Sequence, residues 1–351
     1  MFILRFDLRA PGATPNEHAA LFRTAVEMSA WADQHDCLSI VLSEHHAAPD
    51  GYLPAPLVMA AAIAAVTEHV PLSIAATLLP LHLPARLAEE LVVLDHLSRG
   101  RTSVVLGVGY REEEYALYGV DFADRGRIAD DHLAQLLDHL AGSTGLTPAP
   151  FTPGGPSVAW GGASAVAARR AGRNGIGFVS TGRHDGLADA YADAAVAAGH
   201  APGGCFLPDP DTPMAVFVND DLDAGWEEVG PALLADATAY AEWNDPAINP
   251  NAASTASLSA NRVASLSAAT TVDELRAAAG SHRVVTVDEA VGLIREHGFL
   301  GLHPLVGGLD PAIAWTYLRR VADDVLPRLA LDDASTTNPA DDHAATAASL
   351  G

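Results

Sequence analysis

Three neighbouring side chains in the sequence can move protons: Glu44, His45 and His46. They follow an apolar run, residues 37–42, and precede a loop rich in proline and glycine. An imidazole titrates near neutral pH and can serve as a general acid or base, and a neighbouring carboxylate can orient it. The segment is therefore either an acid-base centre or a pair of surface histidines. A shared metal ion is a weaker alternative, because adjacent residues of an extended segment point in opposite directions. We predict no metal.

Two further features could line a pocket beside these residues. Ala75 and Ala76 end another apolar run, and their small side chains would let a flat ring approach the backbone. His82 follows near the same strand end, where it either lines the pocket or has a structural role.

A glycine pair and a serine form a turn that suits a phosphate group. Gly161 and Gly162 follow residues 158–160, and Ser164 takes the N-cap position of the next helix. Main-chain amides at such a turn point outward and can bind an anion. Arg127, which opens an earlier helix, could add positive charge. The alternatives are an ordinary turn with a serine cap and a solvated arginine.

Short apolar runs alternate with helical stretches along most of the chain. The predicted strands are residues 2–7, 38–42, 72–77, 102–107, 158–160, 176–180, 214–218 and 299–302. The predicted helices are residues 17–35, 56–67, 84–97, 127–140, 164–173, 186–198, 225–243 and 311–329. This alternation of apolar strands with helices is typical of parallel strands that are buried on both faces. A closed barrel and an open doubly wound sheet both fit. The first strand is not followed by the dinucleotide fingerprint G-x-G-x-x-G, which favours the barrel.

These elements predict a single (β/α)8 TIM barrel domain over residues 1–330. The segment 244–271 is rich in Asn, Ala and Ser, and we expect an insertion loop before the last strand. Residues 331–351 are polar and predict a disordered tail. Active sites of such barrels lie at the carboxyl ends of the strands, so the candidate residues should meet at one face.

Composition and charge exclude several classes of partner. The net charge of -24 argues against nucleic acid or an anionic membrane as a partner. All 20 basic residues are arginine, which excludes a Schiff-base lysine and a P-loop. Cys37 and Cys205 are far apart and fit free thiols. No signal-peptide pattern is present, and the apolar run 57–66 is too short to span a bilayer. We expect a cytoplasmic enzyme.

Five stretches, in order and spacing, resemble the bacterial-luciferase-like flavin monooxygenases. They are SIVLSEHH, LPAPLVMAAAIAAVT, IAATLLPLHLPARLAEELVVLDHLSRGR, GVGYREEEYALYGVD and VAWGGAS. The resemblance extends over roughly residues 1–330 and is weakest through residues 202–285. It implies a (β/α)8 barrel that binds reduced FMN at the carboxyl ends of its strands. It also implies that molecular oxygen is used to oxidise a small organic substrate.

The resemblance assigns roles residue by residue. It implies that His45 is the catalytic histidine, that Glu44 orients it, and that Ala75 and Ala76 form an unusual cis peptide behind the flavin ring. The substrate pocket would include His46 and His82. The residues that would hold the flavin phosphate are Arg127, Gly161, Gly162 and Ser164.

Some features depart from luciferase itself and leave alternatives open. Gly107 and Val108 stand where luciferase has a reactive cysteine and a phosphate-binding arginine, so light emission is not expected. Related enzymes share nearly all these motifs but transfer hydride with a deazaflavin coenzyme. A non-catalytic flavin-binding partner subunit is an alternative of another class. The chain has no nicotinamide fingerprint, so a separate flavin reductase should supply the reduced flavin, and the resemblance implies a homodimer.

Overall fold

A curled parallel sheet of eight strands forms the centre of the molecule. The computed structural model describes residues 1–180, 185–208, 212–243 and 269–329. The strands run in the order β10-β1-β2-β3-β4-β5-β6-β7. Their bounds are β1 (Phe2–Phe6), β2 (Cys37–Leu42), β3 (Leu72–Leu78), β4 (Thr102–Gly107), β5 (Ser157–Gly161), β6 (Gly177–Val179), β7 (Cys205–Phe206) and β10 (Leu300–Leu302).

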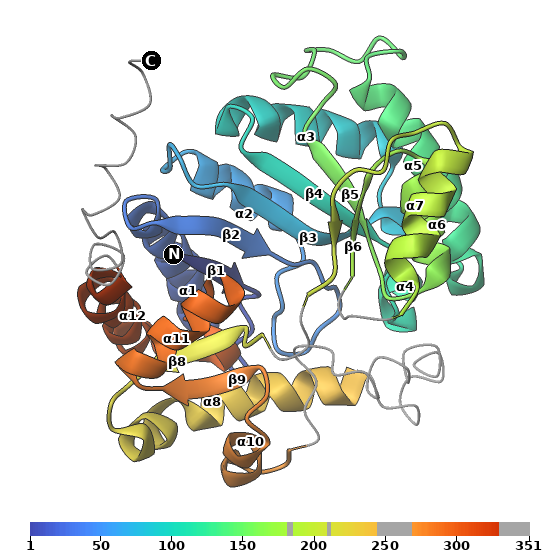
Figure 1. Cartoon of the computed structure of the whole chain (residues 1–351). Coiled ribbons are helices and arrows are strands. Elements are labelled where there is room, and N and C mark those ends of the chain that lie inside the picture. Colours follow the sequence, from blue (N-terminus) through green and yellow to red (C-terminus); the bar gives the residue numbers. More distant parts are fainter. Residues whose placement is uncertain (181–184, 209–211, 244–268, 330–351) are drawn as a thin grey trace, which may run out of the picture.

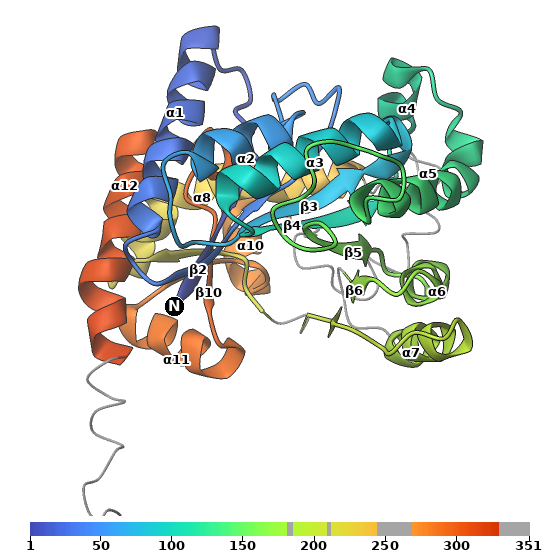
Figure 2. The same cartoon turned by 90° about the horizontal axis from the view of Figure 1, so that it is seen from above.

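Helices surround this sheet, as the view from above shows (Figures 1 and 2). They are α1 (Pro15–Ala32), α2 (Pro56–Ala64), α3 (Pro84–Ser98), α4 (Glu112–Tyr118), α5 (Arg125–Leu140), α6 (Ala165–Arg173), α7 (Leu187–Ala197), α8 (Leu222–Trp243), α10 (Val272–Ala278), α11 (Val287–His297) and α12 (Pro311–Arg320). Strands and helices alternate as expected, and the predicted TIM-barrel fold is confirmed. The predicted tail, and the predicted insertion except for residues 269–271, lie outside the described residues, so those two predictions remain untested.

The strand register brings the carboxyl ends of the strands to one edge. Phe6 pairs with Leu42, Leu78 with Gly107, and Gly161 with Val179, each near the end of its strand. Because neighbouring strands are parallel, the residues that follow them lie at the same face of the barrel. That face receives the segments after β1, β2, β5 and β10, which carry most of the polar residues discussed below.

The core explains why the strands adopt this arrangement. Side chains along each strand point alternately into the barrel and toward the surrounding helices, so most of both faces of the sheet is covered. The buried strand residues include Phe2, Leu4, Phe6, Ile40, Leu42, Ile74, Leu106, Trp160 and Phe178. Most residues of these strands have no solvent-facing side, which is why the sequence shows largely continuous apolar runs there instead of alternating ones.

The seventh predicted strand, residues 214–218, pairs differently from the prediction. It forms β8 (Ala215–Val218), whose hydrogen-bonded partner is β9 (His282–Val285), a strand that the sequence analysis missed. The eight-stranded sheet instead includes the two-residue strand β7, which pairs with β6. A two-residue strand has too little periodicity to be recognised. The helices α4, α10 and α11 were also not predicted.

Gly301 of β10 marks a close contact between the sheet and the segment that leads into β8. A methyl group added there would lie 2.6 Å from the carbonyl oxygen of Pro213 and 2.7 Å from Cα of Met214. Both are main-chain atoms, so they cannot rotate away. Glycine therefore allows β10 to pack directly against the chain that enters β8.

We predict that Gly301→Ala lowers the free energy of unfolding by about 1–3 kcal/mol, because the backbone must shift to accept the methyl group. Urea denaturation measures this change. Gly292→Ala is the matched control: Gly292 is an exposed residue of α11 with open space around it. Alanine there should raise the stability by up to about 1 kcal/mol. Equal stability of Gly301→Ala and the wild type would show that the contact is not tight.

Candidate active site

His45 is buried and is held by a carboxylate from another segment. Its Nδ1 lies 2.8 Å from Oε1 of Glu114 on α4. The same oxygen accepts a hydrogen bond from the main-chain N–H of His46 at 2.9 Å and one from Arg111 at 3.4 Å. Arg111 also donates to the carbonyl of His46 at 2.8 Å. The start of α4 is thus tied to the loop that follows β2.

Glu44, which was expected to orient His45, binds two other histidines instead. Its Oε1 lies 2.7 Å from Nε2 of His46 and 2.8 Å from Nε2 of His82. Its Oε2 accepts the main-chain N–H of Leu78 at 3.1 Å. Adjacent residues at the end of β2 point in different directions, so Glu44 and His46 form one pair while His45 forms another.

The position of α4 depends on a small apolar cluster. Tyr115 packs with Leu78, Leu81 and Phe122, and its hydroxyl donates to the carbonyl of Val108. This packing buries one face of α4 and leaves Glu114 fully buried beside Tyr115. The sequence analysis missed Glu114. The available signal was the run of three glutamates before an aromatic residue in REEEYALYG, with a glycine in the left-handed C-cap position.

The surroundings of His45 favour its neutral form. Burial lowers the pKa of His45 below its usual value, the nearby Arg111 and Arg9 add to this effect, and the bond to Glu114 opposes it. A carboxylate can only accept a hydrogen bond, so the proton of the neutral ring belongs on Nδ1. This leaves Nε2 with a lone pair, and His45 is thus arranged to accept a proton at that atom.

Aromatic rings and two arginines enclose His45. Tyr52 and Trp243 each have ring centroids 4.8 Å from that of His45. The guanidinium carbons of Arg9 and Arg111 both lie 4.2 Å from the ring centroid of Trp243. Trp243 is the last described residue of α8, so the end of this helix covers the barrel mouth beside His45. Such a cover reduces the access of water to the imidazole.

The strands next to β2 offer small residues at the same face. Ala75 and Ala76 are joined by a cis peptide bond, as the sequence analysis expected. A methyl group added at Gly107 would lie 3.5 Å from Cβ of Ala76, and one added at Gly161 would lie 4.0 Å from the same atom. Ala76, Gly107 and Gly161 are therefore neighbours across β3, β4 and β5. They form a strip of nearly bare backbone that a flat ring system could approach.

The glycine-serine turn after β5 is built as predicted. Ser164 caps α6, and its hydroxyl accepts the N–H of Ala167 at 3.2 Å. Gly162 has a φ of 150°, and its own N–H donates to the carbonyl of Val179, so this amide is already used. The first N–H groups of any helix have no intrahelical acceptor. Ala165 and Val166, the first two residues of α6, therefore offer main-chain donors for an anion.

Arg127, the fourth residue predicted to hold a phosphate, lies on the surface of α5. Its side chain is 64% exposed and forms ion pairs with Asp124 at 2.7 Å and Asp131 at 3.3 Å. These carboxylates belong to its own helix or to the residue just before it. Within the described residues, no hydrogen bond or ion pair joins Arg127 to the turn at Ser164. Its phosphate-binding role stays a prediction.

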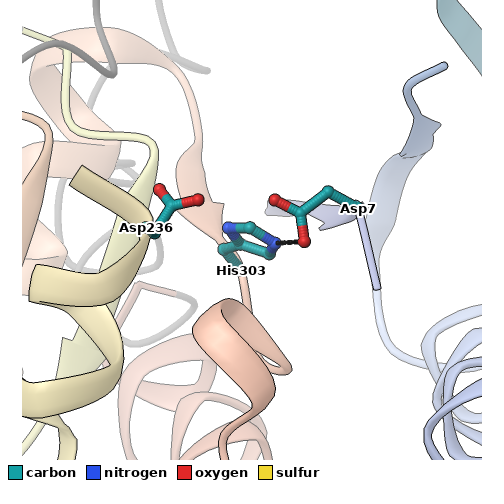
Figure 3. A group of neighbouring side chains, drawn as sticks. All are labelled: Asp7, Asp236 and His303. Atoms are coloured by element: carbon teal, nitrogen blue, oxygen red, sulfur yellow. Dashed lines mark ion pairs between the residues drawn. The ribbon is translucent and has the colours of Figure 1, made fainter. Parts of the chain in front are cut away.

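A second buried polar cluster lies at the ends of β1 and β10. His303 follows β10, and its Nε2 is 3.2 Å from Oδ1 of Asp7, which follows β1 (Figure 3). Asp236 of α8 lies on the other side of the His303 ring (Figure 3). The Oδ2 atom of Asp236 lies 2.8 Å from Nε2 of His282 on β9. Burial alone would raise the pKa of Asp7, but His303, Arg5 and Arg9 hold it well below its usual range. The sequence analysis singled out none of the three residues drawn in the figure as site residues.

We predict that Glu114→Gln lowers the pKa of His45 further, because the carboxylate of Glu114 is the group that raises it. An NMR titration of the His45 ring measures this shift directly. Glu113→Gln is the matched control, since Glu113 is the exposed neighbour on α4. If both variants titrate like the wild type, Glu114 does not carry the charge that acts on His45.

A second prediction concerns Glu44→Gln and pH. Burial alone would raise the pKa of Glu44, but His46 and His82 lower it to about 2 from 4.5. The ionised Glu44 carboxylate, bound to these histidines, therefore stabilises the folded state fully above pH 4.5, and this stabilisation is lost as the pH falls toward 2. Burial alone would lower the pKa of His82, but Glu44 raises it above 6.5. The contribution of His82 is full below pH 6.5 and is lost as the pH rises through its folded pKa.

The stabilising contributions of Glu44 and His82 are both complete between pH 4.5 and 6.5. There Glu44→Gln should lower the free energy of unfolding by about 3 kcal/mol, because it removes one partner of a buried pair. Denaturant unfolding at a series of pH values tests this. Glu89→Gln, on the exposed face of α3, should change stability by less than about 0.5 kcal/mol. A loss that is the same at every pH would contradict the assignment.

Comparisons with known proteins agree with the fold. The model of the luciferase-like monooxygenase family matches residues 2–297. A 4-hydroxyprotoasukamycin monooxygenase from Streptomyces nodosus subsp. asukaensis is 30% identical over 122 residues, which are 35% of this chain and 33% of that protein. Across the first three curated relatives, the matched stretch spans 38%, 33% and 27% of their length.

Solved structures resemble most of the chain at low identity. Monooxygenase RslO1 from Streptomyces bottropensis is 21% identical with a TM-score of 0.67, covering 93% of this chain and 99% of that one. The oxygenating constituent of 3,6-diketocamphane monooxygenase from Pseudomonas putida, in complex with FMN, is 20% identical with a TM-score of 0.58, covering 93% and 98%. An F420-dependent secondary alcohol dehydrogenase is 14% identical with a TM-score of 0.59, covering 92% and 98%. At these identities the structural likeness shows the shared fold, and with the family match over residues 2–297 we conclude that the chain belongs to the luciferase-like monooxygenase family.

Proposed function

We propose that this protein is a flavin-dependent monooxygenase that uses reduced FMN and molecular oxygen to oxidise a small organic substrate. One observation carries the proposal. A buried, neutral imidazole held by Glu114 stands at the end of β2, and the strip of Ala76, Gly107 and Gly161 lies at the ends of the three strands that follow. A proton acceptor and a surface for a flat ring therefore share one barrel mouth.

The residues of the strip fit a flavin ring. Larger side chains would fill the space over β3, β4 and β5, and a methyl group at Gly161 would already lie 3.0 Å from Val105. Ala75 and Ala76 would lie behind the ring, and the turn from Gly161 to Ser164 would hold the phosphate at the start of α6. Reduced FMN, when bound, would supply the electrons with which one oxygen atom enters the substrate and the other leaves as water.

The chain's own residues would handle the proton and the surroundings. His45 would accept a proton at Nε2 and return it, while Glu114 keeps the ring in the correct tautomer. Arg9 and Arg111 would stabilise negative charge that develops near the imidazole. Trp243 would keep water away from it. Glu44, His46 and His82 form the adjacent wall of the pocket, and Glu44 would act through these two histidines.

The main alternative keeps the barrel and changes the cofactor. A deazaflavin coenzyme has a ring of similar shape, and one structural neighbour is an F420-dependent dehydrogenase. Val108 stands where luciferase has a phosphate-binding arginine, and this difference does not distinguish the two cofactors. A non-catalytic flavin-binding subunit is less well supported, because it would not need a buried histidine whose Nε2 is arranged to accept a proton.

The proposed partners follow from the chemistry. A separate flavin reductase would supply reduced FMN. A homodimer and a cytoplasmic location remain predictions. Among the described residues, no helix combines the length and the apolar character needed to cross a membrane.

The proposal is tested by giving the purified protein reduced FMN and isotope-labelled oxygen together with a panel of aldehydes, ketones and terpenes. We expect the label in a product detected by mass spectrometry. His45→Ala should lower the rate by about 10²-fold or more, as for the loss of an acid-base group. His69→Ala removes an exposed histidine and is the control.

The same protein is then given reduced deazaflavin coenzyme with alcohols and ketones as substrates. Hydride transfer with this coenzyme, and no labelled product with reduced FMN, would overturn the monooxygenase proposal in favour of the alternative. Equal rates for His45→Ala and the wild type would exclude the proposed role of the imidazole.

A further inference from the structure

Unpaired polar atoms are concentrated at one place in the barrel mouth. Among the described residues, 11 buried side-chain nitrogen and oxygen atoms have no hydrogen-bond partner. Seven of them belong to four residues: Asp7, Arg9, Asp236 and His303. We call these four residues the polar cluster. Each is at most 1% exposed. They do make ion-pair contacts, but these contacts are not aligned as hydrogen bonds.

Such an arrangement is costly unless something else occupies it. A buried donor or acceptor without a hydrogen bond loses its hydration without replacement, and native proteins contain few of them. Several in one cluster indicate a site built to bind a polar group. The seven atoms are the three guanidinium nitrogens of Arg9, one carboxylate oxygen each of Asp7 and Asp236, and both ring nitrogens of His303. Four of them, Nε and Nη1 of Arg9, Oδ1 of Asp236 and Nε2 of His303, lie in ion pairs. The remaining atoms are Oδ2 of Asp7, Nη2 of Arg9 and Nδ1 of His303. The cluster therefore offers donors and acceptors side by side.

The polar cluster is next to His45. Tyr52 connects the two, because its ring centroid is 4.8 Å from that of His45 and 5.1 Å from the guanidinium carbon of Arg9. Asp7 and His303 follow β1 and β10, which lie on one side of β2. The strip of small residues lies on β3, β4 and β5, on the other side of β2. A molecule at the polar cluster would thus reach His45 from the side opposite the strip.

The charges in the cluster argue against a metal ion. Asp7, Asp236 and His303 could each offer a ligand atom, and these atoms lie within 4.8 Å of one another. However, Nη1 of Arg9 lies 3.5 Å from Oδ1 of Asp236, so a divalent cation would sit beside a guanidinium. The second oxygen of Asp236 is already bound to His282. Arginine is always charged in proteins, so this repulsion cannot be removed by deprotonation.

The same charges argue against an anion. Arg9 is already balanced by Asp50, whose carboxylate lies 3.0 Å from its Nε, as well as by Asp236. A carboxylate ligand would meet Asp7 and Asp236 at close range. A neutral group that both accepts and donates hydrogen bonds avoids either repulsion. A carbonyl oxygen can accept from Arg9 while a hydroxyl on the neighbouring carbon donates to an aspartate.

The walls above the cluster favour a ring on the same molecule. The guanidinium of Arg9 lies 4.5 Å from the ring centroid of Tyr240 and 4.2 Å from that of Trp243. The indole of Trp243 also lies over Arg111 and beside His45. It therefore occupies the space between the cluster and the imidazole. A flat ring of the substrate could pack against Tyr240 and Trp243 in the same way.

We propose that the polar cluster is the recognition end of the substrate pocket, and that the substrate is an uncharged ring compound with a carbonyl and a hydroxyl group on neighbouring carbons. That the bound molecule is a substrate rests on the proposed function, because this requires a reaction at His45. The carbonyl lies on Arg9, the hydroxyl on Asp7 or Asp236, and the ring against Trp243.

The test compares four small probes by isothermal titration with the wild-type protein. Phenacyl alcohol carries the ring, the carbonyl and the hydroxyl. Acetophenone lacks the hydroxyl, phenethyl alcohol lacks the carbonyl, and mandelate adds a negative charge. We expect phenacyl alcohol to bind at least about tenfold more tightly than each of the others, because each loses a hydrogen bond to a charged group or gains a repulsion. Equal binding of acetophenone and phenacyl alcohol overturns the proposal.

A variant locates the bound probe. Asp236→Asn keeps the shape of the side chain and should lower the affinity for phenacyl alcohol about tenfold, while acetophenone binds as before. Asp288→Asn, an exposed aspartate of α11 paired with Arg328, is the matched control. The comparison of the four probes on the wild type stands even if Asp236→Asn does not fold. An unchanged affinity in folded Asp236→Asn overturns the assignment of the site.

Two further measurements separate the competing explanations. Stoichiometric zinc or manganese in the purified protein, lost in Asp236→Asn but kept in Asp288→Asn, would replace the proposal by a metal site. Binding of reduced FMN is measured separately. If reduced FMN does not bind, the proposed function fails while the probe series still reports on the cluster. If it binds and the four probes do not differ, this inference alone fails.

Discussion

The bond between His45 and Glu114 is the interaction on which the rest of the site depends. One carboxylate oxygen accepts from the His45 ring, from the main chain of His46 and from Arg111. A buried carboxylate is unfavourable unless donors surround it, so the loop after β2 and the start of α4 are held in one arrangement. That arrangement sets the tautomer of His45 and places Arg111 under Trp243.

The two adjacent histidines after β2 show how surroundings assign different roles to the same residue type. His45 lies among aromatic rings and two arginines, and its pKa is lowered. His46 joins Glu44 and His82 in a separate group of three, where the carboxylate raises the pKa of His82. The first imidazole is suited to accept a proton, whereas the second group is suited to hold the strand ends together. The mouth of the barrel also has two chemically different sides, a bare strip over β3, β4 and β5 and the polar cluster beside β1 and β10.

Particular residues show how far the sequence could be interpreted. The apolar runs predicted most of the strands, and the N-cap at Ser164 and the cis peptide at Ala75 were also anticipated. Glu114 was missed because its partner is 69 positions away in the chain, and no local pattern reports such a contact. The orientation of Glu44 was misjudged for a related reason. In an extended segment the side chains of adjacent residues point in opposite directions, so Glu44 and His45 were bound to have different partners. Which partner each side chain finds depends on other strands and helices. Arg127 was expected to bind a phosphate on the basis of its position, whereas its nearest charges belong to its own helix and to the residue just before it.

The sequence by itself determined the class of the fold and the strand ends at which polar residues would gather, because hydrophobic periodicity is a local property of the chain. The tertiary structure alone decided which carboxylate holds His45, and that β8 pairs with β9 outside the eight-stranded sheet. It also decided that Asp7, Arg9, Asp236 and His303 come together with unpaired atoms. These outcomes depend on contacts between segments that are distant in the chain, and the free energy of such contacts arises only when the segments pack together.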